Sequence, residues 1–372
     1  MSDDPPPRVV VAGGHSAGHI EPAMNFADAL RQLEPTAEIT ALGTVRGLDT
    51  TLVPARGYPL ELIPPVPLPR TLNRALLQTP GTLRRAVQAA GEVLDRVRAE
   101  ILVGFGGYVA APAYLAARKR RLPIVIHEAN ARPGIANRLA ARITTHVFTA
   151  TPSARLPHAT AIGIPLRPAI TNLDRPGLRE AARRRFGLRP NGSVLLVTGG
   201  SQGARAINTA VAGAAPRLRA AGVQVLHITG PQHTLAMPDG DTADPPYIVL
   251  SYLDEMHHAY AAADFVICRS GAMTCAELTA VGLPAAYVPL PLRGGEQRHN
   301  AEPVVAAGGA LLVDNAHLDS AWIETTLVPI LTSPERIAAM SARASAAGTP
   351  DAGAVLAGHV LTTIARHHPH TS

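Results

Sequence analysis

Short apolar runs alternate with amphipathic stretches along most of the chain. Runs bounded by glycine, proline and polar residues predict buried strands, and amphipathic stretches of about ten residues or more predict helices. We expect strands at residues 8–12, 38–42, 59–63, 101–104 and 123–126 and near His146 and Ala159, then near Val194, Val223, Tyr247, Phe265, Ala285 and Ala310. This alternation predicts an α/β fold of parallel sheets with helices on both faces.

The alternation occurs twice, once in each half of the chain. A length of 372 residues suits two domains of ordinary size. We therefore expect two Rossmann-like domains whose parallel sheets face each other across a cleft, joined by a hinge near residues 163–168. The first domain is expected to span residues 1–163 and the second 164–350. The segment 351–372 begins with a predicted helix over 351–367 and is expected to pack back on the first domain.

Three predicted strands run into glycine-rich turns, at residues 13–19, 105–108 and 199–203. Helices are expected to follow from Pro22, Pro112 and Ala204, and another over 83–98. Free N–H groups at a helix start attract anions, and glycine lets a phosphate approach the backbone closely. The same turn also serves as a plain connection between strand and helix, so one such turn is weak evidence. Polar residues at the ends of predicted strands strengthen the case, because open α/β sheets bind ligands there: His19, Asn130, Ser201, Arg269 and Ser270.

Charge and composition narrow the class of partner. With 34 Lys and Arg against 28 Asp and Glu, the sequence pI is about 9.8, which favours an anionic partner such as a nucleotide or an acidic membrane surface. Five Phe and one Trp are too few for the base-stacking surfaces of nucleic-acid binders. Two cysteines form neither a metal-ligand spacing nor a disulfide framework, which points to a reducing cytoplasm. The N-terminus does not read as a signal peptide, and no apolar run reaches the ~18 residues of a membrane span.

Five motifs follow one another in order along the chain: GFGGYVAAP at 104–112, IHEANARPGIANR at 126–138, GIPLR at 163–167, GGSQGARAIN at 199–208 and RSGAMTCAELTAVGLPAAYVPLP at 269–291. Together they resemble the MurG family of actinobacterial type, within glycosyltransferase family 28. The resemblance implies a GT-B fold and an N-acetylglucosaminyltransferase that inverts the anomeric carbon. Its expected reaction moves GlcNAc from UDP-GlcNAc to the 4-hydroxyl of MurNAc in undecaprenyl-linked lipid I, giving lipid II for peptidoglycan synthesis, cell shape and division.

The resemblance also implies where UDP-GlcNAc binds. The route is expected to need no metal and no cofactor, since no Asp-x-Asp pair stands where a metal would be needed. Backbone N–H groups, helix dipoles and a cation then stabilise the leaving diphosphate, with Arg167 as that cation or as one side of a hinge salt bridge. Leu253 matches the residue whose backbone binds uracil, and Glu277 matches the ribose ligand. Gln297 matches a sugar ligand. The residue before it, Glu296, stands where the family often has another glutamine. The implied donor-binding residues are Ser16, Asn130, Arg167, Ser201, Leu253, Glu277 and Gln297.

The acceptor hydroxyl needs a general base, and imidazole has a suitable pKa. His19 matches the proposed base of the family; its alternative role is a helix cap. The acceptor pyrophosphate is expected at Gly14, Gly18, Gly106 and Gly107. Tyr108 and His127 match acceptor-side positions, where they contact the acceptor or only orient the loops. His15 stands where the family has glycine, so its side chain either blocks a positive φ and close phosphate approach or adds a donor to the anion.

A peripheral membrane contact is expected at the cytoplasmic face, because the lipid stays in the bilayer. The segment 68–83, with Leu72, Leu76, Leu77, Arg70 and Arg74, and nearby Arg84 and Arg85 suit anionic lipid, as do residues 118–121, which read equally well as a solvated basic surface. Each basic residue near such a surface contributes about 1 kcal/mol.

Two alternatives stay open at this point. One is a MurG-like enzyme with another acceptor, motivated by His15. The other is a non-transferring relative that binds or epimerises UDP-GlcNAc. Expected partners are UDP-GlcNAc, lipid I, the anionic membrane surface and cell-wall or division proteins, but not nucleic acid. The sequence leaves open the acceptor peptide, the lipid length and the oligomeric state.

Overall fold

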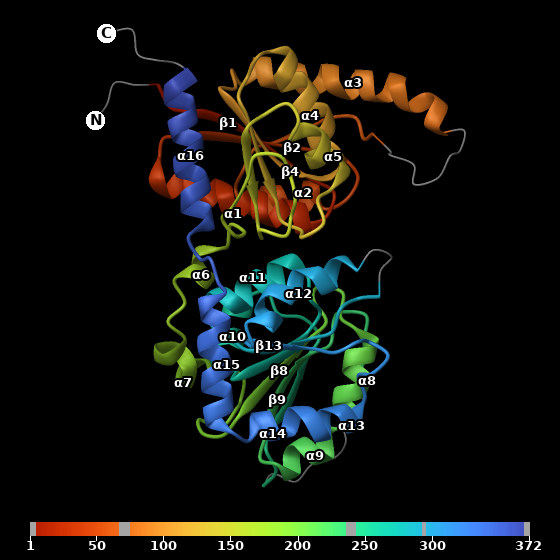
Figure 1. Cartoon of the computed structure of the whole chain (residues 1–372), viewed down its shortest axis with the longest axis vertical. Helices are drawn as coiled ribbons and strands as arrows, with labels where there is room; N and C mark the ends of the chain where they lie inside the picture. Colours follow the sequence, from red (N-terminus) through yellow and green to blue (C-terminus); the bar gives the residue numbers. More distant parts are fainter. Residues whose placement is uncertain (1–4, 67–74, 236–242, 292–294, 368–372) are drawn as a thin grey trace. The chain divides into compact units, whose positions relative to one another are not determined.

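The computed structural model describes residues 5–66, 75–235, 243–291 and 295–367, with only the backbone for 75–80. The chain divides into two compact units. Unit 1 comprises Met1–Arg167 and Pro350–Ser372, and unit 2 comprises Pro168–Thr349. Each unit is built around a parallel sheet flanked by helices (Figure 1).

In the described part of unit 1, seven strands form a parallel sheet in the order β3-β2-β1-β4-β5-β6-β7. The order reverses between β1 and β4, and ligands of such sheets bind at the carboxyl ends of the strands on either side of this point. The strands are β1 (Arg8–Gly13), β2 (Glu38–Gly43), β3 (Leu60–Leu62), β4 (Ile101–Gly106), β5 (Ile124–Glu128), β6 (His146–Thr149) and β7 (Ala159–Ala161).

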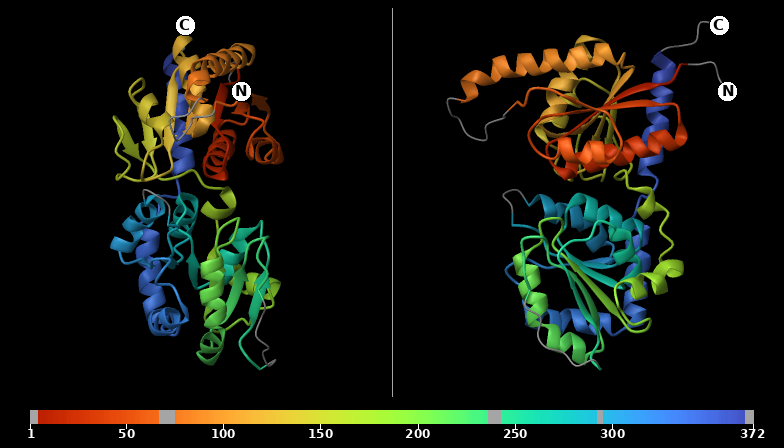
Figure 2. Two further views of the ribbon diagram at one scale, coloured as in Figure 1. Left: turned by 90° about the vertical axis from the view of Figure 1, so that its right-hand side faces the viewer. Right: turned by 180° about the vertical axis from the view of Figure 1, so that it is seen from behind.

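Helices cover both faces of this sheet, with α1 and α3 on opposite sides (Figure 2). Val9 and Val11 of β1 pack in one buried cluster with α1 and α16, whereas Val10 packs in another with α3 and α4, as the period of two in a strand requires. The helices are α1 (Ala17–Leu33), α2 (Asp49–Ala55), α3 (Ala75–Arg96), α4 (Gly107–Lys119), α5 (Ile135–Ala140) and α16 (Ala352–His367). Helix α16 packs directly against α1.

Six strands form the sheet in the described part of unit 2, in the order β10-β9-β8-β11-β12-β13, which reverses between β8 and β11. The strands are β8 (Val194–Thr198), β9 (Gln224–Ile228), β10 (Tyr247–Leu250), β11 (Phe265–Cys268), β12 (Ala285–Tyr287) and β13 (Ala310–Leu312). The helices are α6 (Pro168–Thr171), α7 (Arg175–Arg185), α8 (Arg205–Gly213), α9 (Ala215–Ala220), α10 (Met256–Ala262), α11 (Ala272–Ala280), α12 (Glu296–Ala306), α13 (Ser320–Trp322), α14 (Val328–Leu331) and α15 (Pro334–Ala346), with a π-helical turn at Ile323–Leu327.

Every strand expected from the sequence is present, and every connection within the two sheets is parallel. Two helix starts were wrong in the same way. Helix α1 begins at Ala17 rather than Pro22, and α4 begins at Gly107 rather than Pro112. Proline favours the first position of a helix, yet each of these prolines is the sixth residue of its helix. In both helices, residues of the glycine-rich segment already form the first helical turn.

Two further helices differ from the expected pattern. Helix α3 begins at Ala75, eight residues before the expected start, because Ala75, Leu76, Leu77 and Gln78 are strong helix formers. Helix α2 was not expected at all, since its DTTLVPA sequence combines β-branched residues with proline. Residues 68–74 of the expected membrane segment lie outside the described residues, and only the backbone of 75–80 is described. In the described ranges, no helix has the length and apolar character that a membrane crossing requires.

Candidate active site

The first glycine turn joins β1 to α1 at the point where the order of strands reverses. A Cβ at Gly14 would lie 2.6 Å from Oδ1 of Asp49 and 2.7 Å from Cγ2 of Val109, so only glycine fits there. The backbone N–H of His15 donates to both carboxylate oxygens of Asp49, each at 3.1 Å. The backbone of the turn is therefore hydrogen-bonded directly to a carboxylate.

Asp49 is the residue at this turn that sequence reasoning missed. It is the first residue of α2 and is fully buried. Burial raises the pKa of its carboxyl, and the hydrogen bond from His15 acts against that rise. From sequence alone, with no helix expected here, Asp49 reads as an ordinary surface charge, so only the tertiary structure reveals its role.

His15 does not block a positive φ, because it adopts one, with φ of 79°. That part of the expectation is wrong: the buried carboxylate of Asp49 holds the backbone in the left-handed region, which histidine tolerates better than most residues. The exposed His15 ring stands edge-on to Tyr108, with ring centroids 5.6 Å apart and an interplanar angle of 70°. This contact links the first glycine turn to the start of α4.

His19 is the third residue of α1 and is half-buried. Its Nδ1 lies 3.0 Å from the carbonyl oxygen of Phe105. A carbonyl only accepts hydrogen bonds, so Nδ1 carries the proton and Nε2 is the basic nitrogen of the neutral ring. Ser16 occupies the N-cap position, and its backbone oxygen accepts from the N–H of His19 at 3.0 Å. The end of β4 thus fixes the tautomer that a general base requires.

The glycines of the first two turns meet around this ring. Gly106 and Gly107 have φ of 89° and 80°. A Cβ at Gly107 would lie 2.6 Å from the carbonyl oxygen of Gly14 and 3.3 Å from the His19 ring. Gly18 is exposed, and a Cβ there would meet only Ser16 Oγ, at 3.9 Å. The structure therefore gathers Gly14, Gly106, Gly107 and His19 at one edge of the sheet and leaves the backbone at Gly18 open to approach.

His127 lies beneath the loops rather than at the surface. It is fully buried, and its Nε2 lies 2.7 Å from the carbonyl oxygen of Gly163. Its Nδ1 has no hydrogen-bond partner among the described residues. Burial lowers the pKa of His127 to about 4, so the ring is neutral near pH 7. Of the two roles expected for this residue, the geometry favours orientation of the backbone, at the segment after β7 that contains Gly163.

The buried carboxylate of Glu128 orders the loop between β5 and α5. Glu128 accepts hydrogen bonds from the backbone N–H groups of Asn130 and Gly134 and from Nδ2 of Asn137, each at 3.0 Å. Burial raises the pKa of Glu128, and these donors oppose the rise. Asn137 in turn accepts from the hydroxyl of Tyr114 at 2.7 Å. Sequence reasoning named Asn130 but missed Glu128 and Asn137, which hold it in place.

Arg167 forms the salt bridge that was its alternative role. Its Nη2 lies 2.8 Å from Oε2 of Glu21, and Arg56 Nη1 binds the same oxygen at 2.9 Å. The Arg167 side chain is still 44% exposed. One carboxylate is thus shared by two guanidinium groups.

In unit 2, the turn after β8 presents Ser201 at the surface. Gly200 and Gly203 have φ of 82° and 74°, and a Cβ at Gly203 would collide with the carbonyl oxygen of Thr229. Helix α8 follows with Ala204 at its N-cap, as expected from the sequence. The N–H groups of this helix start and the open backbone at Gly200 are features that suit an anion.

The remaining candidates of unit 2 lie on α11 and α12 and in the loops after β10 and β11. Glu277 on α11 accepts from the hydroxyl of Tyr260 at 2.7 Å. Gln297 on α12 uses Oε1 to accept from the N–H of Leu290 at 2.9 Å. Leu253 is half-buried in the loop between β10 and α10. Ser270, after β11, is fully buried, and its hydroxyl has no hydrogen-bond partner among the described residues.

Within the described ranges, one group of side chains has the spacing of a metal site: Glu255, His257 and His258, just before and at the start of α10. Glu255 is exposed and pairs with Arg185 at 2.6 Å. The group lies close in sequence to Leu253 but contains none of the residues assigned above.

Comparison with known proteins decides the family. The glycosyltransferase family 28 N-terminal domain matches residues 9–149, and the family 28 C-terminal domain matches residues 194–355. The chain belongs to glycosyltransferase family 28. The resemblance to the MurG family is thereby confirmed, along with the prediction of two parallel-sheet α/β domains.

Relatives in family 28 match almost end to end. An enzyme of Thermobifida fusca is 55% identical over 362 residues, covering 97% of this chain and 96% of its own. One of Mycolicibacterium smegmatis is 56% identical over 363 residues, covering 96% and 94%. Both are named UDP-N-acetylglucosamine–N-acetylmuramyl-(pentapeptide) pyrophosphoryl-undecaprenol N-acetylglucosamine transferase.

Solved structures agree with the family 28 assignment. The crystal structure of Acinetobacter baumannii MurG matches with a TM-score of 0.78 at 25% identity, covering 96% of this chain and 100% of that one. A UDP-GlcNAc 2-epimerase of Neisseria meningitidis matches with a TM-score of 0.66 at 14% identity, over 96% of this chain. At that identity the epimerase shares the fold alone.

Proposed function

We propose that the chain transfers GlcNAc from UDP-GlcNAc to the 4-hydroxyl of MurNAc in lipid I, with inversion at the anomeric carbon, giving lipid II. The observation that carries the proposal is identity of 55–56%, over nearly the full length, to relatives named for this transfer. Since relatives of this similarity share the reaction in their names, the epimerase alternative has only the common fold in its favour.

His19 is the general base in this proposal. With Nδ1–H donated to Phe105, Nε2 accepts the proton of the acceptor hydroxyl as its oxygen attacks the anomeric carbon. The bond from that carbon to the diphosphate oxygen breaks on the opposite face, so configuration inverts. Gly14, Gly18, Gly106 and Gly107 would bind the acceptor pyrophosphate through their backbone, with Tyr108 beside them.

The donor diphosphate is assigned to the Ser201 turn, where helix-start N–H groups stabilise the charge that develops on the leaving group. Glu277, oriented by Tyr260, would bind the ribose hydroxyls, and the backbone of Leu253 the uracil. Gln297 and Asn130 would bind the sugar, together with Ser16. Arg167 would act on the diphosphate by exchanging Glu21 for phosphate oxygens. No step in this route uses a metal or cofactor.

We further propose that the protein works as a peripheral enzyme at the cytoplasmic face of the membrane. Unit 1 would take the lipid-linked acceptor and unit 2 UDP-GlcNAc. The exposed basic residues Arg118 and Lys119 and the segment 68–83 would contact anionic lipid. This part of the proposal rests on the chemistry of a membrane-bound acceptor.

The test is transfer of labelled GlcNAc to a soluble short-chain lipid I analogue. His19→Ala should lower kcat by about 10²- to 10⁴-fold, the usual contribution of a general base. His317→Ala, at an exposed histidine of unit 2, is the matched control and should transfer normally.

Two outcomes would contradict the proposal. If His19→Ala keeps more than about a tenth of the wild-type rate, the base assignment is wrong. If the wild type binds UDP-GlcNAc but does not glycosylate the analogue, the acceptor is wrong, and restoration of transfer by His15→Gly would identify an enzyme with another acceptor.

A further inference from the structure

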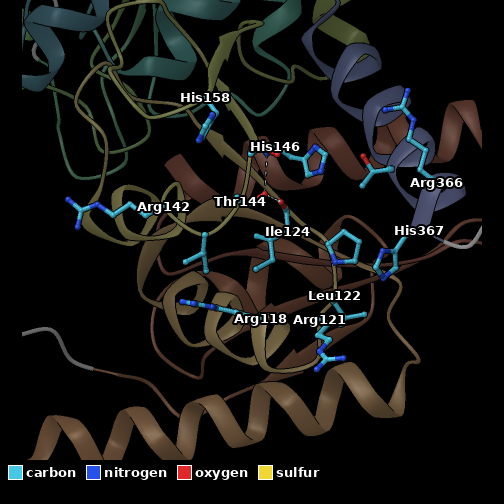
Figure 3. A pocket seen from close by; sticks show the side chains of 14 residues that line it. Arg118, Arg121, Leu122, Ile124, Arg142, Thr144, His146, His158, Arg366 and His367 are labelled. Atoms are coloured by element: carbon cyan, nitrogen blue, oxygen red, sulfur yellow. Dashed lines mark hydrogen bonds between the residues drawn. The ribbon is translucent and has the colours of Figure 1, made fainter.

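Unit 1 has a pocket at the edge of its sheet opposite the glycine turns. Ile124 and His146, the first residues of β5 and β6, line it, so it lies at the amino ends of these strands. Its volume is about 640 Å³, which is within the range of small-molecule sites. Figure 3 shows its side chains coming from the end of α4, from the loops beside β5 and β6, and from α16.

All charged side chains around this pocket are basic. Four arginines line it, and no aspartate or glutamate does: Arg118, Arg121, Arg142 and Arg366. In the part of the chain that the structure describes, none of the four pairs with a carboxylate. Arg120, between the first two, shows the contrast, because it binds Asp95 through two hydrogen bonds of 2.7 and 2.6 Å.

His146 lines the pocket and contacts a second imidazole, that of His359 on α16. His146 Nδ1 lies 2.9 Å from Nε2 of His359 on α16. Burial is the main cause that lowers the pKa of both rings, and the charge of Arg366 lowers both further. An anion in the pocket would compensate a charge that the described residues leave uncompensated.

The backbone around the pocket is held in unusual conformations. Among the described residues, four that are not glycine have a positive φ, and two of them line this pocket: Arg121 at 58° and His158 at 61°. A third is His15 in the candidate active site. The positive φ of Arg121 belongs to the end of α4, where the N–H groups of Arg121 and Leu122 donate to the carbonyls of Arg118 and Ala117.

We propose that this pocket is a binding site for a phosphate-bearing polyanion, separate from the transfer site. Guanidinium groups bind phosphate oxygens in pairs through their parallel N–H donors, and four of them from three parts of unit 1 suit a ligand with at least two phosphoryl charges. The ligand is either a small soluble molecule or the headgroup of a phospholipid. Because Arg366 belongs to α16, the bound anion also ties this helix to α4 and β6. The inference does not depend on the proposed transfer reaction.

The experiment uses the full chain with excess UDP present, so that the donor site is occupied. Binding of inorganic pyrophosphate is measured by calorimetry for the wild type, for Arg142→Gln/Arg366→Gln and for the control Arg217→Gln/Arg336→Gln. The control removes the same charge from exposed positions of unit 2. Flotation with phosphatidylglycerol vesicles, against phosphatidylcholine vesicles, tests the headgroup.

For a soluble ligand, the pocket variant should lose at least about tenfold in pyrophosphate affinity, since charge-assisted hydrogen bonds are lost. For a headgroup, pyrophosphate binds weakly throughout, and the pocket variant floats with the anionic vesicles clearly less than the wild type and the control do. Transfer to the soluble acceptor analogue stays at the wild-type rate in both cases, which separates this test from that of the transfer reaction. If the pocket variant matches the wild type in both assays, or the control loses as much, the proposal is overturned.

Discussion

The glycine turns after β1 and after β8 reach similar backbone shapes by different means. The turn of unit 2 places glycine at its positive φ positions, Gly200 and Gly203. The turn of unit 1 places a histidine there, His15, and holds it through hydrogen bonds to a buried carboxylate, Asp49. The shape of the turn after β8 is allowed by its own residues, whereas that of the turn after β1 is imposed by a neighbouring helix.

This difference shows which substitutions should disrupt each turn. A turn made of glycines fails when a side chain is added to it. A turn imposed by a neighbour fails when the neighbour changes, even though its own sequence is intact. Substitutions in the two units therefore separate the two cases.

The largest effect is expected from Gly203→Ala in unit 2. The new Cβ would both strain a φ of 74° and collide with the Thr229 carbonyl, so we expect a loss of about 2–4 kcal/mol in the free energy of unfolding of unit 2. Urea unfolding measures it, and UDP affinity should fall as well.

Gly200→Ala is the matched control for this prediction. It has a similar φ of 82°, but no atom lies within 4 Å of the added Cβ. Only the strain of about 1 kcal/mol is then expected. Equal losses in the two variants would show that the close approach to Thr229 does not matter.

The next effect is expected from Asp49→Ala in unit 1. It leaves the His15 N–H without its acceptor, which should lower the free energy of unfolding by about 1–3 kcal/mol. In the transfer assay, KM for the acceptor should rise while UDP affinity stays unchanged. A change confined to UDP affinity would contradict the assignment of this turn to the acceptor.

Asp49 also predicts a dependence on pH. Its pKa is raised in the folded state from an ordinary 3.8. The folded protein then binds this proton more tightly than the unfolded chain does, so the stability from Asp49 is complete below pH 3.8 and is lost as pH rises through the folded pKa. The difference in unfolding free energy between wild type and Asp49→Asn should therefore shrink with rising pH. A constant difference from pH 3.8 upwards would exclude this linkage.

The smallest effect is expected from His15→Gly, which makes the turn after β1 resemble the turn after β8. Relief of the positive φ stabilises the fold, while the lost contact with Tyr108 destabilises it. We expect a net change within about 1 kcal/mol, measured by thermal unfolding. A loss much larger than this would mean that the imidazole, rather than Asp49, holds the turn.

The sequence predicted what depends on local patterns. Apolar runs such as VLLVT in β8 identified the strands, and glycines at strand ends identified the turns. It did not predict residues whose role depends on burial. Asp49 and Glu128 look like surface acids in the sequence, and only the packing of α2 and of the loop after β5 removes them from water. Pro22 and Pro112 misplaced two helix starts, since their preference for the first turn was overridden by the turns before them. The roles assigned to the site residues remain predictions.

Because of helix α16, the core of unit 1 is completed only at the end of synthesis. Leu356 and Val360 complete the cluster around α1 and β1, yet the 182 residues of unit 2, from Pro168 to Thr349, are translated before them. At about 5–20 residues per second, this takes roughly ten to forty seconds. During that interval the second half of the chain can finish folding on the ribosome while the first half still exposes an apolar face. The nascent half that carries His19 is thus the one whose apolar surface stays exposed longest during synthesis.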